Sequence, residues 1–303
     1  MVKKPCIPEF DISGTISAVG TQVKKWKVGD EVYGITGADA VFKTGHGGLA
    51  EYTVLGQDNM YTNSQSNLTV RCRKPDFISW EEASSVPLTA ITAYKAERVD
   101  PKVPLSVGGS IFINGGSGGV GLYAIQIARH FVGDSGKIVV TCSAKNVELV
   151  KQNGADEVID YTSLNVPSHL AKTYRDRKFD IVLDAIGSFD IYKACAAFLK
   201  PEGIYLMIGA PIPANLGGFF SMGFNIVAAT CLPGFLGGVP RKFRMTMMSP
   251  TKETVAAMGE LVDQKVIKPV LDSVWKFDDE GIKGAYSKIM SHRARGKVVV
   301  KVQ

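Results

Sequence analysis

A run of glycines, GGSGGVG at 115–121, carries the clearest chemical pattern in the chain. Gly116, Gly118 and Gly121 fill a G-x-G-x-x-G template: the first permits a tight turn, the second lets backbone approach a pyrophosphate, and the third lets a helix pack closely on a strand. An apolar run at 111–114 precedes it and an apolar-periodic segment at 122–131 follows it. The pattern predicts a strand, a turn and a helix whose free N–H groups bind a dinucleotide. The alternative is a glycine-rich turn without a ligand.

The residues roughly 20 positions further on predict which dinucleotide binds, because NAD sites place an acid there for the ribose 2′-hydroxyl. Here the sequence is TCSAKN at 141–146, and the first carboxylate is Glu148. Ser143 and Lys145 offer a hydroxyl and a cation, and charge-assisted bonds to a 2′-phosphate contribute roughly 1.5 to 3 kcal/mol each. We therefore predict a preference for NADPH. The alternative is that Lys145 only solvates the start of a helix.

The composition excludes several classes of protein. With 303 residues, 45% hydrophobic and 21% charged, the chain is typical of a globular α/β enzyme of two domains. The net charge of +6 favours phosphorylated cofactors but is too diffuse to indicate a nucleic-acid partner. The uncharged stretch at 203–240 is broken by glycines and prolines, so we expect no transmembrane segment.

The five cysteines form no C-x-x-C pair and are odd in number, which predicts neither a disulfide framework nor a zinc site. A reducing compartment follows, and the N-terminal residues contain no apolar leader. The expected location is therefore cytoplasmic.

From residue 110 onward, unalternating apolar runs are interleaved with helical patterns, as in a parallel sheet covered on both faces. Strands are predicted at 111–114, 137–142, 157–161, 179–185, 203–209 and 243–248, and helices at 119–131, 146–153 and 251–264. The first hundred residues contain shorter β-rich runs, at 12–19, 31–33 and 49–54. The predicted fold class is α/β, a doubly wound parallel sheet beside a small β domain.

Several blocks together resemble the zinc-free quinone oxidoreductase and ζ-crystallin branch of the medium-chain dehydrogenase/reductase superfamily, over nearly the whole chain. Within that branch the chain resembles the reticulon-4-interacting-protein and chloroplast-envelope quinone oxidoreductase homologues, judged from CSAKN at 142–146 and the loop at 292–297. The blocks that carry the resemblance are VGDEVYG at 28–34, GLAEY at 48–52, VPLTAITA at 86–93, GSGGVG at 116–121, LVKQNGADEVIDY at 149–161, DAIG at 184–187 and GKVVV at 296–300.

The resemblance implies a partial GroES-like β domain at 1–95, a Rossmann NADP-binding domain at 96–265, and a C-terminal return to the β domain at 266–303. It implies hydride transfer from NADPH, in a cleft between the domains, to a quinone or an α,β-unsaturated ketone or aldehyde. Thr92 is expected near the nicotinamide. The other residues implied to bind the cofactor are Ser117, Gly119 and Val120 at the pyrophosphate, Ser143, Lys145 and Asn146 at the 2′-phosphate, Tyr161 at the adenosine, and Ala185, Ile186 and Gly209 at the nicotinamide ribose.

The sequence departs from the family pattern in four places. Phe10 stands where zinc alcohol dehydrogenases have a histidine ligand, so we expect no catalytic zinc, and Glu9 stands where the family usually has glycine. Met1 falls inside the family's β domain, so its opening strands are expected to be missing, and the polar segment at 61–72 is foreign to the family. These departures keep an alternative open: a weak or inactive NADPH-binding protein, either nucleotide-sensing or RNA-binding.

Candidate donors to the substrate oxygen are His46, in the loop GHGG at 45–48, and Tyr52, on the strand expected after it. Each has a simpler interpretation, as a surface-loop residue and a packed barrel residue respectively. Phe219, Phe220, Met222 and Phe224 are candidates to line a pocket for a small apolar carbonyl or quinone. Core packing or the contact of a homodimer would equally explain them.

Overall fold

The structure is a computed structural model that describes residues 5–37, 40–56, 74–98, 105–209, 216–232, 236, 238–245 and 250–303. Its contacts divide the chain into two units: unit 1 contains Met1–Tyr94 and Met248–Gln303, and unit 2 contains Lys95–Met247. The division differs from the expected one in its second boundary. Helix α8 (Lys252–Asp263) falls with unit 1, where the ammonium of Lys265 just beyond it lies 5.2 Å from the centre of the Phe77 ring.

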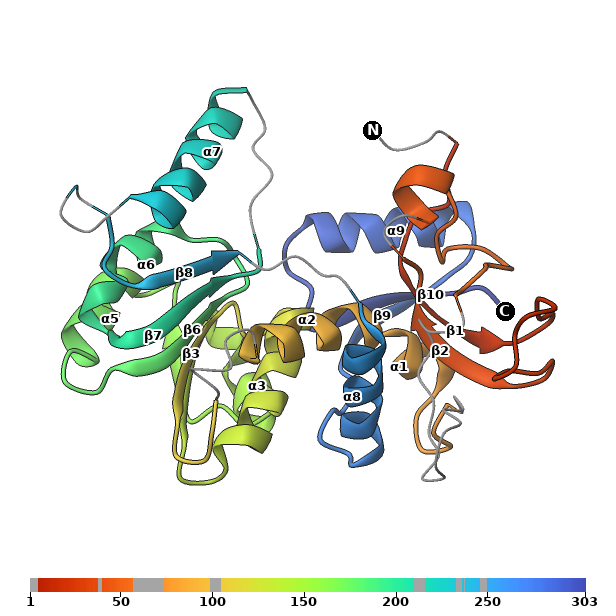
Figure 1. The fold of residues 1–303 in the computed structure, drawn as a ribbon, viewed down its shortest axis with the longest axis horizontal. Helices are drawn as coiled ribbons and strands as arrows, with labels where there is room; N and C mark the ends of the chain where they lie inside the picture. Colours follow the sequence, from red (N-terminus) through yellow and green to blue (C-terminus); the bar gives the residue numbers. More distant parts are fainter. Residues whose placement is uncertain are drawn as a thin grey trace. The chain divides into compact units, whose positions relative to one another are not determined.

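Unit 2 is built on a parallel sheet of six strands in the order β5-β4-β3-β6-β7-β8 (Figure 1). This order confirms the predicted doubly wound fold, and the chain reverses direction across the sheet between β3 and β6. The strands are β3 (Ser110–Asn114), β4 (Lys137–Cys142), β5 (Glu157–Asp160), β6 (Phe179–Asp184), β7 (Leu199–Met207) and β8 (Lys242–Met245). Ligands of such sheets bind beyond the carboxyl ends of the strands, at the point of reversal.

Helices connect these strands and cover the sheet. The central strands β3, β4 and β6 are buried along nearly their whole length, and for this reason their sequences do not alternate between apolar and polar residues. Phe112 on β3 lies in the core, with its ring centre 5.8 Å from that of Phe179. The connecting elements are α3 (Gly119–Val132), η2 (Ala144–Asn146), α4 (Val147–Gln152), α5 (Val166–Thr173), α6 (Phe189–Ala194), η3 (Cys195–Ala197) and α7 (Leu216–Cys231). Among the helices described, none has the length and apolar character needed to cross a bilayer.

Unit 1 contains two small sheets, one antiparallel (β1 with β2) and one parallel (β9 with β10). Its C-terminal strand is tied to its first hundred residues, because the Lys301 ammonium lies 2.9 Å from the Glu81 carboxylate. The elements not yet bounded are β1 (Asp11–Thr15), β2 (Glu31–Ile35), η1 (Ala40–Thr44), α1 (Trp80–Ser84), α2 (Pro87–Glu97), β9 (Leu271–Lys276), α9 (Asp279–Met290) and β10 (Lys297–Lys301).

The strand expected at 49–54 does not form, and this prediction is wrong. Among the described residues, the chain around Gly47 meets the stretch before β1 through three backbone bonds, from Ile7 N to Gly45 O, from Gly48 N to Glu9 O and from Leu49 N to Pro8 O. Of these, the last alone involves the segment at 49–54. A Cβ at Gly47 would lie 2.2 Å from the Pro8 carbonyl oxygen, so glycine permits a close crossing here that is not a strand ladder. The strand expected at 12–19 ends at Thr15, and the one expected at 203–209 already begins at Leu199. The polar segment at 61–72 lies outside the described residues.

One carboxyl group is buried without a compensating charge. Glu97, at the end of α2, is 1% exposed, and neither of its oxygens has a hydrogen-bond partner in the part of the chain that the structure describes. Burial raises the pKa of this carboxyl well above its usual range, because the charged form loses its hydration.

We expect Glu97 to make the protein less stable as the pH rises. Between the ordinary pKa and the raised one, the folded state keeps a proton that the unfolded state has released, so the free energy of unfolding falls by about 1.4 kcal/mol per pH unit. Glu97→Gln should lose this slope, whereas Glu202→Gln, at an exposed position of the same unit, should keep it. Urea unfolding from about pH 5 to about pH 9 measures both. An unchanged slope in Glu97→Gln would contradict the assignment.

Candidate dinucleotide-binding site

The glycine turn follows β3 and is fixed to the neighbouring strand. Gly115 N donates to Thr141 Oγ1 at 2.8 Å, and Gly116 N donates to Thr141 O at 2.9 Å. The backbone conformation requires glycine at position 115, where φ is +86°, and not at position 116 as the template suggests. Gly116 is needed for space, because a Cβ there would lie 1.8 Å from Val140 Cγ1.

The other two glycines of the template differ in what surrounds them. A Cβ at Gly121 would lie 2.3 Å from the Gly115 carbonyl oxygen and 2.7 Å from the Gly116 Cα, so α3 and the turn approach too closely for a side chain. The nearest atom to a Cβ at Gly118 is 3.6 Å away. The space in front of Gly118 is therefore open, which is what a site for a pyrophosphate requires.

Helix α3 begins at this turn with unpaired amides. Its N-cap is Gly118, which has no side chain to cap the helix, and the first helical hydrogen bond runs from Leu122 N to Gly118 O at 3.0 Å. The N–H groups of Gly119, Val120 and Gly121 precede that bond and have no acceptor within the helix. Together with the helix dipole they form a site for an anion.

A second loop lies beside this turn, after β4. Asn146 Nδ2 donates to Ser117 Oγ at 3.0 Å, so the loop that contains Ser143, Lys145 and Asn146 contacts the glycine turn directly. Ser143 makes no side-chain cap bond to η2, and the Lys145 side chain is exposed. Asn146 is 6% exposed, and its Oδ1 has no partner among the described residues.

Sequence reasoning missed Asp160, which ends β5 beside the end of β4. Its carboxylate accepts bonds from the Thr162 hydroxyl at 2.7 Å and the Thr162 amide at 2.9 Å. These bonds, with a further one from the Ala144 amide, hold the pKa of this carboxyl below its usual value. The structure therefore places a carboxylate next to the loop of Ser143. Tyr161, the expected adenosine contact, follows it and is 56% exposed.

A second missed residue, Asp184, fixes the loop that contains Ala185 and Ile186. Asp184 is fully buried at the end of β6, and its carboxylate accepts five hydrogen bonds. The donors are Asn114 Nδ2 at 2.8 Å, Ile186 N at 3.0 Å, Gly187 N at 2.9 Å, Ser188 N at 2.6 Å and Tyr205 OH at 2.7 Å. The DAIG block at 184–187 resembles a family motif, and the structure gives the reason for its first residue: the Asp184 carboxylate accepts bonds from three backbone amides of the loop that follows.

The remaining predicted residues of unit 2 also lie beyond the carboxyl ends of the parallel strands. A Cβ at Gly115 would lie 2.7 Å from Ile186 Cδ1, so this exposed side chain lies over the glycine turn. A Cβ at Gly209 would lie 2.2 Å from the Ala185 carbonyl oxygen. The predicted cofactor-binding residues of unit 2 thus lie on loops at the carboxyl ends of β3 to β7, as the doubly wound fold requires.

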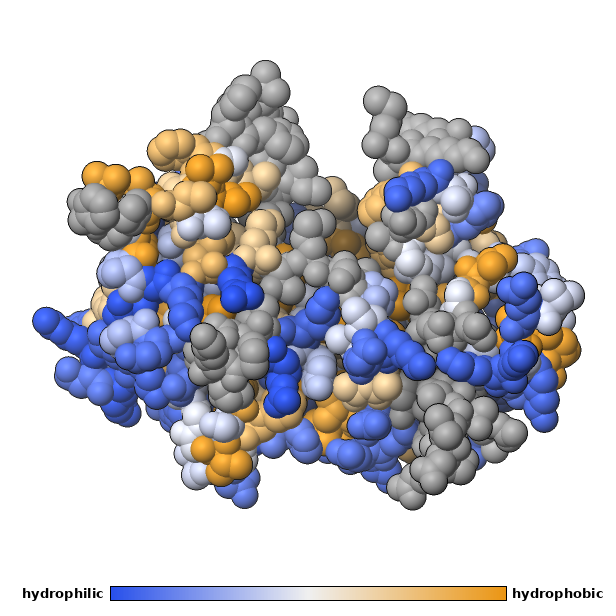
Figure 2. Space-filling model, in the orientation of Figure 1, coloured by the Kyte–Doolittle hydropathy of each residue, from blue (hydrophilic) through white to orange (hydrophobic). Residues whose placement is uncertain are grey.

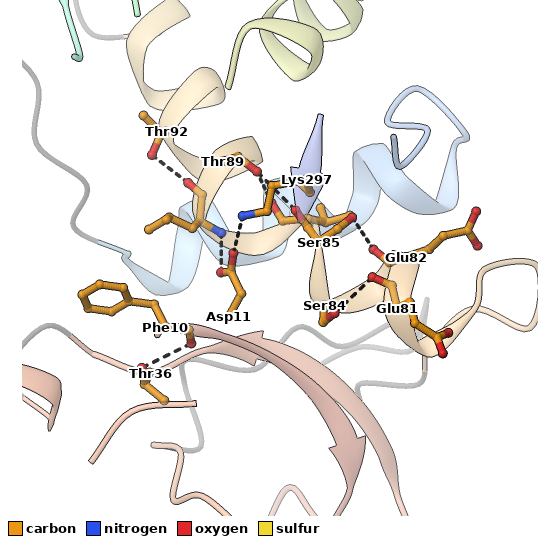
Figure 3. A network of polar contacts seen from close by, with 12 residues as sticks. Phe10, Asp11, Thr36, Glu81, Glu82, Ser84, Ser85, Thr89, Thr92 and Lys297 are labelled. Carbon is orange, nitrogen blue, oxygen red and sulfur yellow. Dashed lines mark hydrogen bonds and ion pairs between the residues drawn. The ribbon is translucent and has the colours of Figure 1, made fainter. Parts of the chain in front are cut away.

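The three residues proposed for chemistry lie in unit 1. Thr92 is buried in α2, and its hydroxyl donates to Leu88 O at 2.7 Å (Figure 3). His46 is exposed, with Nδ1 3.0 Å from Thr44 Oγ1. Tyr52 lies on a bend and is 72% exposed, so it is neither on a strand nor packed in a barrel as expected.

Asp11, beside the position of the family's zinc-binding histidine, makes internal contacts (Figure 3). Its carboxylate accepts a bond from Leu88 N at 2.7 Å and lies 3.1 Å from the Lys297 ammonium. Burial raises the pKa of this carboxyl although Lys297 opposes the shift. Within the described part of the chain, no three His, Cys, Asp or Glu side chains gather to hold a metal ion.

Glu9 stands in the left-handed region, with a φ of +69°, which explains why glycine suits this position. Its carboxylate accepts a bond from the Tyr286 hydroxyl of α9 at 2.6 Å. That bond compensates part of the backbone strain, which is of order 1 kcal/mol or more.

Comparison with known proteins identifies relatives along the whole chain. Residues 1–64 match the alcohol dehydrogenase GroES-like domain, and residues 153–300 match the zinc-binding dehydrogenase family. A trans-enoyl reductase, poxH of Penicillium oxalicum, is 33% identical over 315 residues, which cover 99% of this chain and 80% of the relative. The chloroplastic NADPH-dependent alkenal/one oxidoreductase of Arabidopsis thaliana is 30% identical over 98% of this chain and 64% of its own length. The fold is similar to that of the quinone oxidoreductase from Coxiella burnetii, with a TM-score of 0.72 and 21% identity over 98% of this chain and 80% of that one.

Proposed function

The chain belongs to the medium-chain dehydrogenase/reductase superfamily, and from this premise we propose that it is a zinc-independent reductase that transfers hydride from NADPH to a quinone or an α,β-unsaturated carbonyl. The observation that carries the proposal is the pair of adjoining loops in unit 2. One presents the free amides of α3 to a pyrophosphate, and the other presents Ser143 and Lys145 beside it.

The protein is an oxidoreductase that uses NADPH, in keeping with the relatives named as reductases and as NADPH-dependent. The residues fit a dinucleotide, because the backbone at Gly118 is open to an approaching phosphate while Gly116 and Gly121 leave no room for side chains. Lys145 supplies the positive charge that a 2′-phosphate requires. Asp160 lies near, but its carboxylate already accepts bonds from two Thr162 donors.

When bound, NADPH supplies the hydride. The chain's own part is to hold the pyrophosphate at the start of α3 and to border the nicotinamide ribose with Ala185, Ile186 and Gly209. Thr92 stays a proposed neighbour of the nicotinamide; its hydroxyl already donates within α2, so its oxygen is left to accept. His46 and Tyr52 stay proposed donors to the oxygen that becomes negative during reduction, and the exposure of both side chains is compatible with that role.

Zinc independence is supported by Phe10 at the position of the family's histidine ligand, because a phenyl ring cannot bind the metal. The proposed substrate is a small, apolar carbonyl compound. Of the four aromatic and Met residues suggested for its pocket, Phe219 and Phe220 lie outside the described side chains, and Phe224 is 73% exposed.

The direct test is a panel of quinones, enones and enals offered to the purified protein with NADPH and, separately, with NADH. We expect NADPH oxidation that depends on the acceptor and is unaffected by a metal chelator. NADPH binding without turnover of any acceptor would overturn the reductase proposal in favour of a binding protein. Loss of turnover on chelation would overturn zinc independence alone.

Ser143 and Lys145 should determine the choice of cofactor. We expect Lys145→Ala to weaken NADPH binding roughly tenfold to a hundredfold, the value of one charge-assisted bond, and Ser143→Ala to weaken it less. Both should leave NADH binding nearly unchanged, because NADH lacks the 2′-phosphate. Fluorescence titration with each cofactor measures this, with Lys151→Ala on α4 as a matched control. Equal losses for both cofactors would contradict the assignment.

A homodimer and a cytosolic location complete the proposal. Hydrophobic surface gathers around α7 (Figure 2), where Phe224 and Val227 are exposed. An exposed apolar patch of this kind favours association with a second copy. Sedimentation of the purified protein tests whether it forms a dimer.

The isolated cysteines support the cytosolic location.

A further inference from the structure

One side-chain hydrogen bond joins the two loops of the proposed cofactor site. It runs from Asn146 Nδ2 to Ser117 Oγ at 3.0 Å, between residues that are 29 positions apart in the sequence. Asn146 is buried, at 6% exposed, whereas its neighbour Lys145 is exposed. The amide therefore lies beneath the surface on which a ligand would rest, against the turn that precedes α3.

We propose that Asn146 is a positioning residue for the pyrophosphate turn, and not a ligand of the 2′-phosphate. The inference rests on the proposed NADPH site and deepens it. A serine hydroxyl has one hydrogen and two lone pairs, and Asn146 uses a lone pair of Ser117 by donating to it. The Ser117 hydrogen is then left for another acceptor, and no described residue accepts it. At the N-terminus of α3, a phosphate oxygen is the acceptor that fits.

The other end of the Asn146 amide also indicates a ligand. Its Oδ1 is buried and has no hydrogen-bond partner among the described residues. A buried carbonyl oxygen without a donor is unfavourable, so a ligand that brings a hydroxyl would satisfy it. The adenosine ribose of a dinucleotide has such a hydroxyl at its 3′ position, and this group is present in NADPH and NADH alike.

The pyrophosphate and the 3′-hydroxyl are present in both NADPH and NADH. The proposed role of Asn146 therefore differs from the roles of Ser143 and Lys145 in the same loop. Ser143 and Lys145 should affect NADPH only. Asn146 should affect both cofactors by the same factor, and its effect should depend on Ser117.

The experiment titrates the full chain with NADPH and with NADH, by fluorescence, in the wild type, Asn146→Ala, Ser117→Ala and the double variant. We expect Asn146→Ala to weaken both cofactors about tenfold, with their ratio preserved. The double variant should bind more tightly than the product of the two single losses predicts, because the part of the Asn146 effect that depends on Ser117 is already lost in Ser117→Ala. Thermal unfolding of each variant without cofactor shows whether unit 2 is intact.

Asn146→Asp serves as a second variant of the same shape. Its carboxylate would accept the Ser117 hydrogen and turn it away from the phosphate, so we expect a larger loss than for alanine with both cofactors, and a further loss with NADPH because the new charge repels the 2′-phosphate. A loss confined to NADPH, or fully additive losses in the double variant, would overturn the inference. A wild type that binds neither cofactor would instead overturn the proposed function.

Discussion

Asp184→Ala should lower the free energy of unfolding by about 4 kcal/mol or more, which is at the upper end for single substitutions. The substitution removes an acceptor that is fully buried and serves five donors. Each buried donor left without a partner costs about 1 to 3 kcal/mol, and Tyr205, Asn114 and three amides would be affected. The folded fraction should also bind NADPH poorly, because the loop of Ile186 loses its anchor.

The matched control is Asp180→Ala, at the opposite end of the same strand. Asp180 accepts bonds from Ser110 N at 2.9 Å and from the Lys200 ammonium at 2.6 Å, but it is partly exposed. Water can replace those bonds, so we expect a loss of only about 1 kcal/mol and unchanged NADPH affinity. Tyr205→Phe, which removes one donor and leaves the carboxylate, should cost about 1 to 2 kcal/mol.

Urea unfolding and cofactor titration of the three variants provide the measurements. The interpretation fails if Asp184→Ala is no less stable than Asp180→Ala. It also fails if Asp184→Ala is destabilised but binds NADPH as tightly as the wild type, since the carboxylate would then support the core and not the loop.

Gly121→Ala should destabilise the protein by about 2 to 3 kcal/mol and abolish NADPH binding. Two effects oppose each other at this helical position. Alanine is favoured over glycine in a helix by about 1 kcal/mol. However, the new methyl group would lie 2.3 Å from the Gly115 carbonyl oxygen, and the atoms it meets are backbone, which cannot rotate away. The overlap should therefore dominate and separate the start of α3 from the turn.

Gly118→Ala, three residues earlier, is the control and should weaken NADPH binding without loss of stability. Gly118 has a φ of −79°, which alanine adopts freely, and no atom lies within 3.6 Å of the added methyl group. Stability should be unchanged or slightly higher. NADPH affinity should still fall more than tenfold, because the methyl group would occupy the space that the pyrophosphate needs. Equal stability of the two variants would contradict this account of the two glycines.

The doubly wound sheet and the glycine turn after its first strand followed from local sequence. Buried parallel strands are apolar on both faces, so runs such as 111–114 and 137–142 are recognisable without neighbours. The glycine spacing of 116, 118 and 121 marks the turn between strand and helix, and the predicted helix start at residue 119 is where α3 begins. Ser143 and Lys145 could be proposed to select the cofactor because they lie in the loop after the second parallel strand, where such folds meet the adenosine ribose.

Only the tertiary structure decided which polar groups meet. Asp184 contacts Asn114 and Tyr205, which are 70 and 21 residues away, and Asn146 reaches Ser117 across 29. No local pattern specifies such pairs, because strand order brings them together. The absent strand at 49–54 has the same cause: a strand needs a partner ladder, and within the described residues this segment bonds to the stretch before β1 through Leu49 N alone. The sequence alone determined the fold class and the glycine turn proposed to bind the pyrophosphate, whereas the pairing of distant strands decided what supports that turn.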